Sequence, residues 1–486
     1  MGDDLKQKML SAMTWSTVDR FGQQAVQFVI GLILARLLTP DDYGLIGMVM
    51  VFVSLSTALV DGGFGQALIR KQNADETDYN TVFYFNIVIS LFLYIILFFL
   101  APFIAIFFNQ PQLINISRVI FIAILFNALY LIPVAKMVRN LDYKNGAKIN
   151  IFSVTCSGIA GVTMAFNGFG VWSLVAQQVL FHFFRMICLH YFVKWKPRAI
   201  FSIKVIRNFW SFSINLLGTY ILNMIFNYLY ILILGKFYPK HEVGYYTQAN
   251  KLNETTNTSF QSILVGSTYS LLVKIQYDDE RFRRIFREIA RKISIITFPI
   301  MLVLIIVAHP LIYVLLTEKW IAAVPYFQLL CFASLFAPLY GLNISALNSR
   351  GKSKITFKLE IIKKALILLS VVICFHFGII AMLIGYVFSC FIAYIISVLY
   401  LKNDLNHYIK NQISDFIGCI GIGIFIAACD FGLSFLIHNN HVLLGTQIVT
   451  SGILYILSMK LFYSELYNQV LEVISGKLAL LKKKMI

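Results

Sequence analysis

The sequence predicts an all-α polytopic membrane protein, and composition, run length and charge distribution each point to that fold class. Of the 486 residues, 59% are hydrophobic and only 13% are charged, whereas a soluble domain of this size carries roughly 25% charged residues. The apolar stretches are continuous runs of about 20 residues, the length that crosses a bilayer as a helix. They do not alternate between apolar and polar residues, as the strands of a membrane β-barrel do.

Fourteen stretches are predicted to span the membrane, and short connections with helix breakers such as Pro40, Pro111 and Pro239 separate them. No connection is long enough to hold a soluble domain, so function is expected within the helices themselves. The expected spans are residues 12–38, 43–66, 79–108, 112–137, 147–167, 169–193, 205–236, 242–273, 281–316, 321–348, 357–377, 379–401, 413–437 and 442–463.

Basic residues predict the orientation of these spans. In the tails and connections, 31 Lys and Arg residues lie on one side of the membrane, and only Lys236, Lys240 and Lys319 lie on the other. Because Lys and Arg collect in cytoplasmic loops, both termini are predicted to be cytoplasmic, in a bacterial inner membrane. The net charge of +18 is therefore explained by the basic residues of the predicted cytoplasmic loops and tails, and no nucleic-acid partner is needed to explain it. The Lys-rich end, residues 477–484, is expected to rest on anionic phospholipids.

An internal repeat divides the predicted spans into two halves. Six helices per repeat is an even number, so both halves should insert with the same orientation, as parallel repeats. We expect an N-lobe at 1–200 and a C-lobe at 201–402 around a central cavity, followed by two C-terminal helices and a basic tail at 403–486. The matching pairs, offset by about 200–210 residues, are Leu125 and Phe126 with Leu335 and Phe336, Pro102 with Pro310, Gly170 with Gly378, and Pro40 with Pro239.

Signatures of soluble enzymes are missing from the sequence. Gly351, Lys352 and Ser353 resemble the end of a phosphate-binding loop, but Ala346 stands where the leading glycine is required. No HExxH or Asp-rich metal motif occurs, and the seven cysteines form no CxxC pair. We therefore expect no catalytic residues, no cofactor and no metal site. Transport would then draw on a Na⁺ or H⁺ gradient, a substrate gradient or a partner.

Basic residues at membrane depth are costly and usually face the interior of a helix bundle. Arg20 shares one helical stripe with Gln24 and Gln27, which indicates a cavity wall. Two interpretations of Arg20 remain open: it meets an anion, or it pairs with Asp61, and both hold if the pair is a gate that opens. The residues predicted to form a cationic substrate-binding cavity are Arg20, Arg118, Arg185 and Lys251.

Amide side chains add a polar lining to this predicted cavity, suited to water or sugar hydroxyls. An ion pair between Lys251 and Glu254 is the structural alternative for the polar span at 242–273. Asp61, which precedes two glycines, and Glu254 are the candidate ion or gate residues, while Asp19 and Asp430 are further cation candidates and Asp430 lies outside the lobes. The lining residues are Gln24, Gln27, Asn223, Asn227, Asn250, Asn257 and Gln261. Arg and Lys beside such amides suit a pyrophosphate headgroup that carries sugars.

Residues 20–24, 34–45 and 61–68 resemble the opening of bacterial polysaccharide exporters, and most closely the colanic acid exporter branch. These oligosaccharide flippases belong to the superfamily that also holds multidrug and lipid II exporters. The resemblance implies alternating-access transfer of an undecaprenyl-pyrophosphate-linked oligosaccharide to the periplasmic leaflet, for surface polysaccharide or lipopolysaccharide biosynthesis, beside glycan polymerase machinery. It also implies a cationic cavity, without a fixed motif that assigns its residues, and a lipid-tail groove on the last two spans.

Two other functions compete with this interpretation. A cation-coupled multidrug antiporter has the same fold, but it should carry an acidic, aromatic-lined cavity, whereas the intramembrane basic residues here at least match the acidic ones. A membrane assembly factor without transport activity would not need polar stripes on the spans at 12–38, 205–236 and 242–273.

Overall fold

The computed structural model describes the backbone of residues 2–405, 409–464 and 466–468, and the side chains within them outside 2–10, 215–216, 258–267, 403–411 and 413–415. Throughout this described part, the regular structure is helical and no strand occurs, which confirms the predicted all-α class. The chain divides into two compact units, residues 1–248 and 249–486, and the boundary falls within α10 (Lys240–Lys274). The lobe boundaries expected from the repeat stay a prediction.

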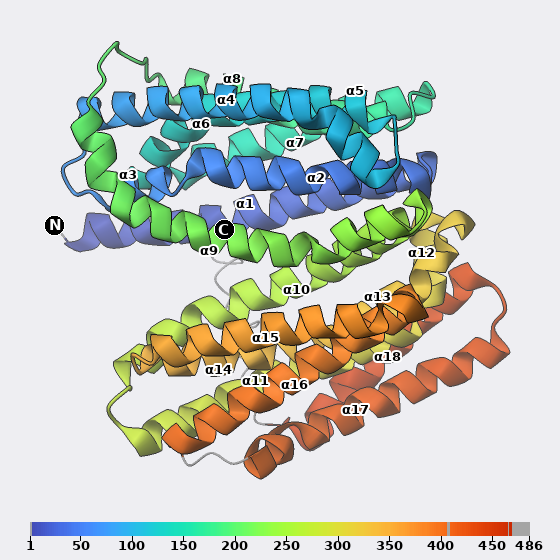
Figure 1. Ribbon diagram of the computed structural model, residues 1–486. Coiled ribbons are helices and arrows are strands. Elements are labelled where there is room, and N and C mark those ends of the chain that lie inside the picture. The colour runs from blue at the N-terminus through green and yellow to red at the C-terminus, as the bar shows by residue number, and fades with distance from the viewer. Residues whose placement is uncertain (1, 406–408, 465, 469–486) are drawn as a thin grey trace, which may run out of the picture. The chain divides into compact units, whose positions relative to one another are not determined.

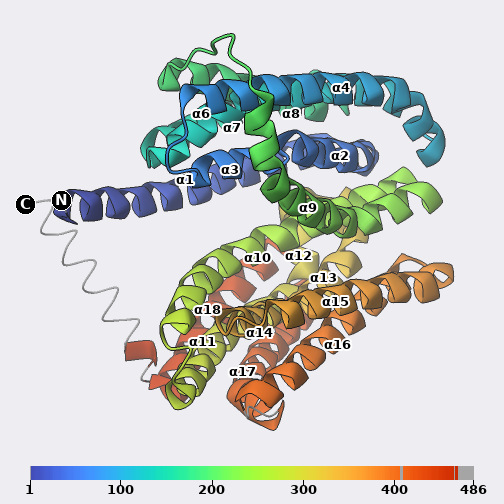
Figure 2. The ribbon, with the colours of Figure 1, turned by 60° about the vertical axis from the view of Figure 1, so that its left-hand side comes forward.

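The first unit is a bundle in which α1 packs along α7, α6 and α7 pack on α8, and α9 packs on α2 (Figures 1 and 2). The start of α10 completes it. Its other helices are α1 (Gly2–Leu37), α2 (Pro40–Asp61), α3 (Phe64–Arg70), α4 (Glu76–Phe108), α5 (Leu113–Ile120), α6 (Ile122–Arg139), α7 (Tyr143–Phe166), α8 (Trp172–Val193) and α9 (Ile203–Phe237).

The second unit pairs α11 with α17, α15 with α16, and α17 with α18. It holds the remainder of α10 and two short 3₁₀ helices, η1 and η2. Its elements are α11 (Asp279–Ile306), α12 (Ala308–Leu316), η1 (Glu318–Ala323), α13 (Val324–Ser334), α14 (Ala337–Ser349), α15 (Ser353–Cys374), η2 (Phe375–Phe377), α16 (Ile379–Leu405), α17 (Ile409–Leu436) and α18 (Asn440–Phe462).

Each of the fourteen predicted spans lies on one or more of these helices. In the described part of the chain, eleven helical segments are long and apolar enough to cross a membrane, so the protein is a multi-pass membrane protein. The predicted spans on α1, α10 and α15 are not among them, because these helices carry more polar and charged side chains. The count of fourteen therefore stays a prediction.

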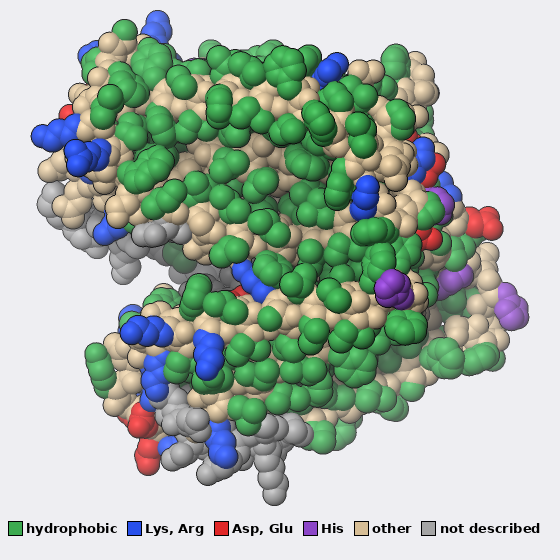
Figure 3. All heavy atoms as spheres, viewed as in Figure 1, with side chains coloured by type: hydrophobic (Ala, Val, Ile, Leu, Met, Phe, Trp, Pro, Cys, Tyr) green, Lys and Arg blue, Asp and Glu red, His purple; other side chains and the backbone are tan. Residues whose placement is uncertain are grey.

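Hydrophobic side chains cover much of the face of each unit that the space-filling view shows (Figure 3). On α4, for example, Phe99 and Phe103 are exposed although they are large and apolar. Exposed apolar surface of this extent is expected where lipid, rather than water, surrounds the helices.

Local sequence sets the breaks between helices. The side-chain oxygen of Thr39 accepts a hydrogen bond from the backbone N–H of Asp42, and Pro40 occupies the first turn, so α2 begins with a capping box. At the other end of α2, Gly62 and Gly63 adopt φ angles of +51° and +78°, which glycine tolerates best. The two glycines after Asp61 therefore interrupt the helix between α2 and α3.

The N-terminal ends of α2 and α10 cross at two glycines within the first unit. A Cβ atom on Gly44 would overlap the carbonyl oxygen of Lys240, and a Cβ atom on Gly244 would overlap the carbonyl oxygen of Pro40. Each glycine thus lies against the first residue of the opposite helix, and Lys240 Nζ lies 3.4 Å from the Asp41 carboxylate. The backbones of α2 and α10 are therefore in direct contact at this crossing, and neither glycine has room for a side chain.

Pro299 lies inside α11 and changes how that helix meets α18. Proline has no backbone N–H, so the carbonyl of Ile295, four residues earlier, loses its partner within the helix. The hydroxyl of Tyr455 on α18 donates to this carbonyl at 3.3 Å. A bond that would normally lie within α11 is replaced by one between α11 and α18.

Candidate functional site

The polar stripe of α1 carries the first predicted site residue. The side chains of Arg20 and Gln27 are exposed, and that of Gln24 is half-buried. On α7, the amide of Asn150 donates to both carboxylate oxygens of Asp19 at 3.1 Å. Among the described residues Arg20 has no ion-pair partner, so its guanidinium remains available to an anion.

Asp61 does not pair with Arg20 in the described structure. Its carboxylate accepts a hydrogen bond from the backbone N–H of Gly65, across the break between α2 and α3. A Cβ atom on Gly65 would lie 2.9 Å from Asp61 Oδ1, so the glycine leaves room for this contact. In this conformation, therefore, Asp61 does not neutralise Arg20, which was one of the two interpretations of Arg20.

Arg118 lies on α5 and contacts α4. Its guanidinium carbon is 4.3 Å from the centre of the Phe98 ring, a cation–π contact. Its Nε is 3.5 Å from the carbonyl oxygen of Phe98, which has no helical donor because Pro102 stands four residues later. Local contacts of α4 therefore engage the half-buried Arg118 side chain.

Arg185 on α8 is engaged separately from Arg118. Its guanidinium lies over the ring of Tyr130 at 4.8 Å, and it lines a cavity of about 150 Å³ with Asp19, Asp142 and Asn150. These residues come from α1, α8 and the start of α7, inside the first unit. Arg185 thus shares its cavity with two carboxylates.

Tyr130 links this cavity to a buried hydrogen-bond network. Its hydroxyl lies 2.9 Å from Nδ1 of His182 and accepts a hydrogen bond from the Asn127 amide at 2.9 Å. We expect Tyr130→Phe to destabilise the protein by about 1–3 kcal/mol, because the buried His182 ring would lose its hydroxyl partner and the half-buried Asn127 amide its acceptor. A thermal unfolding measurement in detergent should show a lower Tm. Tyr191→Phe is the matched control, since Tyr191 on α8, the helix that carries His182, is 74% exposed. Equal Tm values for the two variants would contradict the prediction.

Two of the predicted lining amides lie on α9. Asn223 and Asn227 are both exposed and share one face of the helix. Nearby hydroxyls fix the helix to α2 and α3: Tyr228 lies 2.7 Å from Ser54, and Gln66 donates to Tyr220 at 2.6 Å.

On α10, Lys251 has an exposed side chain. Glu254 accepts a hydrogen bond from the Asn250 amide at 3.0 Å, and within the described side chains no ion pair joins Glu254 to Lys251. Asn257 instead donates to Ser334 on α13 at 2.6 Å, which ties α10 to that helix. Gln261 lies outside the residues whose side chains the structure describes. Of the four predicted cations, Arg118 and Arg185 are thus held by local contacts, whereas Arg20 and Lys251 are not.

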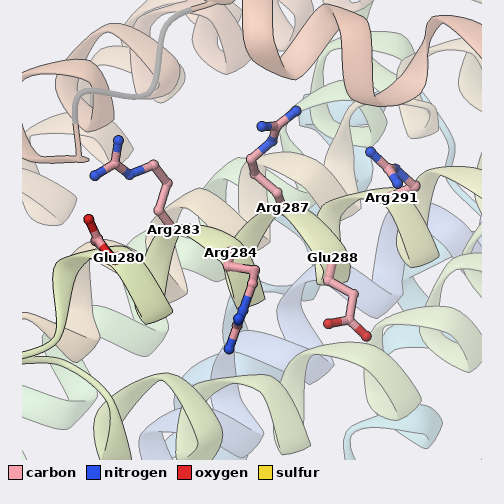
Figure 4. Close-up of a pocket in the computed structure, with 6 residues that line it drawn as sticks. All are labelled: Glu280, Arg283, Arg284, Arg287, Glu288 and Arg291. Carbon is pink, nitrogen blue, oxygen red and sulfur yellow. The ribbon is translucent and has the colours of Figure 1, made fainter.

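Two further features lie outside the predicted site residues. Four arginines in the first turns of α11 line a shallow cavity of about 520 Å³, and Arg283, Arg287 and Arg291 point to the same side of the helix (Figure 4). Their four-residue spacing is visible in the sequence, where it was counted only toward membrane orientation. The second feature is an apolar groove of about 710 Å³ along α17 and α18. Its lining includes Gly418, Gly421, Phe425, Leu454, Leu457 and Leu461.

This geometry defines a multi-pass helical membrane protein with uncompensated cations on polar helices. The family model described as polysaccharide biosynthesis protein matches residues 33–325. The chain belongs to this family, which confirms the resemblance found in the sequence. The family is one of transport proteins and not of enzymes.

Named relatives support the assignment at low identity. The succinoglycan biosynthesis transport protein ExoT of Rhizobium meliloti (strain 1021) is 24% identical over 65% of this chain and 64% of its own length. The teichuronic acid biosynthesis protein TuaB of Bacillus subtilis (strain 168) is 22% identical, over 73% of this chain and 74% of its own. The lipopolysaccharide biosynthesis protein WzxC of Escherichia coli (strain K12) is 24% identical, over 76% and 75%. This chain thus spans a little less than two thirds of ExoT.

Solved structures share the fold. The lipid II flippase MurJ, in an inward closed conformation, matches with a TM-score of 0.74 and 16% identity, covering 93% of this chain and 99% of that one. An inward-facing multidrug resistance MATE family transporter matches with a TM-score of 0.60 and 14% identity, covering 81% and 98%. At these identities the likeness establishes the fold alone.

Proposed function

We propose that the protein is a flippase and not an enzyme, and that it moves an undecaprenyl-pyrophosphate-linked oligosaccharide from the cytoplasmic to the periplasmic leaflet by alternating access. Its product would feed surface polysaccharide biosynthesis. Membership of the polysaccharide biosynthesis protein family supports the substrate class. The printed name of ExoT, a succinoglycan biosynthesis transport protein, supports transport.

The observation that carries the proposal is the pair of uncompensated cations, Arg20 and Lys251. A basic residue at the centre of a membrane helix costs about 2.5–3.5 kcal/mol on insertion scales, so it usually meets water or an anion. Arg offers a planar fork to phosphate, and Lys offers a point charge. We therefore assign the pyrophosphate contacts to Arg20 and Lys251, and the sugar contacts to the exposed amides Gln27, Asn223 and Asn227.

The apolar groove of α17 and α18 suits the lipid tail of such a substrate. Gly418 and Gly421 leave part of the α17 side of the groove without side-chain bulk, while Phe425 of α17 and Leu457 and Leu461 of α18 present apolar surface. A polyprenyl chain would bury apolar area there at about 25 cal/mol per Å² relative to water.

The orientation and further partners belong to the same proposal. We place both termini in the cytoplasm of a bacterial inner membrane, since the basic connections and tails lie on one side. The arginines at the start of α11 would then meet anionic phospholipid headgroups at the cytoplasmic surface (Figure 4). A glycan polymerase on the periplasmic side would receive the flipped lipid.

A transport assay in proteoliposomes tests the proposal against the multidrug antiporter. One set of vesicles carries a fluorescent undecaprenyl-pyrophosphate-linked oligosaccharide, and a second set carries a cationic dye under Na⁺ and H⁺ gradients. We expect protein-dependent loss of the lipid-linked sugar from one leaflet, with no dye movement. Dye transport without sugar movement would identify an antiporter, and movement of neither would identify a protein without transport activity.

A further inference from the structure

Asp430 is a buried acidic residue on α17 that the proposed function does not use. Its side chain is 0% exposed, and it lies on a helix apolar enough to cross the membrane. Within the described residues no Lys, Arg or His forms an ion pair with it. An isolated carboxylate at such depth is expensive, so a compensating positive species is expected nearby.

The facing helix α18 surrounds this carboxylate with oxygen atoms. The hydroxyl of Thr450 donates to Asp430 Oδ1 at 2.8 Å, and the hydroxyl of Ser451 donates to Oδ2. The amide nitrogen of Gln447 donates to the backbone carbonyl of Asp430 at 2.9 Å. Positions 447, 450 and 451 share one face of α18, so a single helix surface presents all three side chains to Asp430.

One of these groups is an acceptor without a donor. The Oε1 atom of Gln447 is buried and has no hydrogen-bond partner, and the whole residue is 1% exposed. Rotating the amide would not help, because its nitrogen is already fixed by the bond to the Asp430 carbonyl. A buried acceptor in this position calls for a bound partner, which a water molecule or a cation could supply.

We propose that Asp430, Gln447, Thr450 and Ser451 form a binding site for a monovalent metal cation, Na⁺. Carboxylate, hydroxyl and amide oxygens are ligands for hard cations. One carboxylate balances one positive charge, whereas a divalent ion would leave an uncompensated charge among apolar helices.

The Na⁺ ion would join α17 to α18, the two helices that line the apolar groove. The inference does not rest on the proposed flippase activity, because ion binding can be measured without any transport substrate. An ion that binds only the folded protein stabilises it in proportion to its occupancy. The site therefore predicts Na⁺-dependent stability.

The test uses the full chain in detergent at constant ionic strength, with choline chloride replaced stepwise by NaCl or KCl. We expect the Tm to rise with NaCl and to saturate, and we expect Asp430→Asn to abolish the rise. Ser434→Ala is the matched control on α17, since among the described residues its hydroxyl donates only to the Phe431 carbonyl of its own helix. This control should keep the wild-type response to NaCl.

Thr450→Val and direct binding of ²²Na⁺ keep the test decisive if Asp430→Asn does not fold. Thr450→Val removes one ligand and keeps the carboxylate, so the Na⁺ concentration at half-saturation should rise about tenfold or more. Wild-type protein with the same Tm in all three salts and no bound ²²Na⁺ would overturn the proposal. Stabilisation by acid alone would overturn it too, because Asp430 would then carry a proton in place of the ion.

Discussion

Replacing either crossing glycine with alanine, Gly44→Ala or Gly244→Ala, should lower the Tm of the protein sharply and reduce the amount of folded protein recovered. Each added Cβ atom would overlap a backbone carbonyl oxygen, of Lys240 or of Pro40. Alanine favours a helix over glycine by about 1 kcal/mol, so the substitution would stabilise an open site. Overpacking costs about 1–3 kcal/mol or more, and we expect the upper end because a backbone atom cannot rotate away.

Thermal unfolding monitored by size-exclusion chromatography in detergent measures this effect. Gly218→Ala is the matched control, because Gly218 lies within α9 and a Cβ atom there would meet nothing within 4 Å. The control should unfold at the wild-type Tm or above it. An unchanged or raised Tm for Gly44→Ala would show that α2 and α10 separate easily, contrary to the reciprocal contact described here.

Removing the two uncompensated cations should cause the largest loss of transport. Arg20→Ala and Lys251→Ala each remove one charged hydrogen-bond donor, worth about 1.5–3 kcal/mol. At 1.4 kcal/mol per tenfold change, flipping of the lipid-linked oligosaccharide should fall about 10- to 100-fold in each variant. Arg20→Lys should fall between wild type and Arg20→Ala, because it keeps the charge and loses the planar fork.

The control for this prediction is Lys354→Ala, which removes an exposed positive charge near the start of α15. Rates are compared per folded molecule, after the Tm of each variant has been measured. If Arg20→Ala and Lys251→Ala both flip the substrate at the Lys354→Ala rate, these cations do not bind the pyrophosphate. The assignment of the site would then fail while the family and fold assignments stand.

Much of the fold could be predicted because lipid leaves the backbone few options. Uninterrupted apolar runs must form helices, and breakers such as Thr39 with Pro40, or Gly62 with Gly63, set where those helices end. The sequence could also place Arg118 and Arg185 inside the membrane. It could not name their neighbours, because helical periodicity defines a face and not the residue that this face meets.

Tertiary contacts explain the remaining differences. The Phe98 carbonyl that contacts Arg118 lacks a helical donor because Pro102 stands four residues later, and the sequence reveals this. Only the packing of the helices brings α5 to that carbonyl. Asp430 received little weight in the sequence because it lies outside the predicted lobes. Its significance depends on Gln447, Thr450 and Ser451, and their arrangement opposite Asp430 requires the pairing of α17 with α18 to be known.

The prolines of α4 and α11 also bear on how faithfully the helices assemble. Apolar helix surfaces in lipid can slide past one another at modest cost, since no hydrophobic force selects one alignment. The carbonyls released by Pro102 and Pro299 each meet a polar side chain on a neighbouring helix, Arg118 and Tyr455. If the neighbouring helix shifted along its axis, these carbonyls would lie in hydrocarbon without a hydrogen-bond donor. Each proline therefore favours one alignment of the neighbouring helix along the bundle axis. The residues that fix this alignment need not contact the transported substrate.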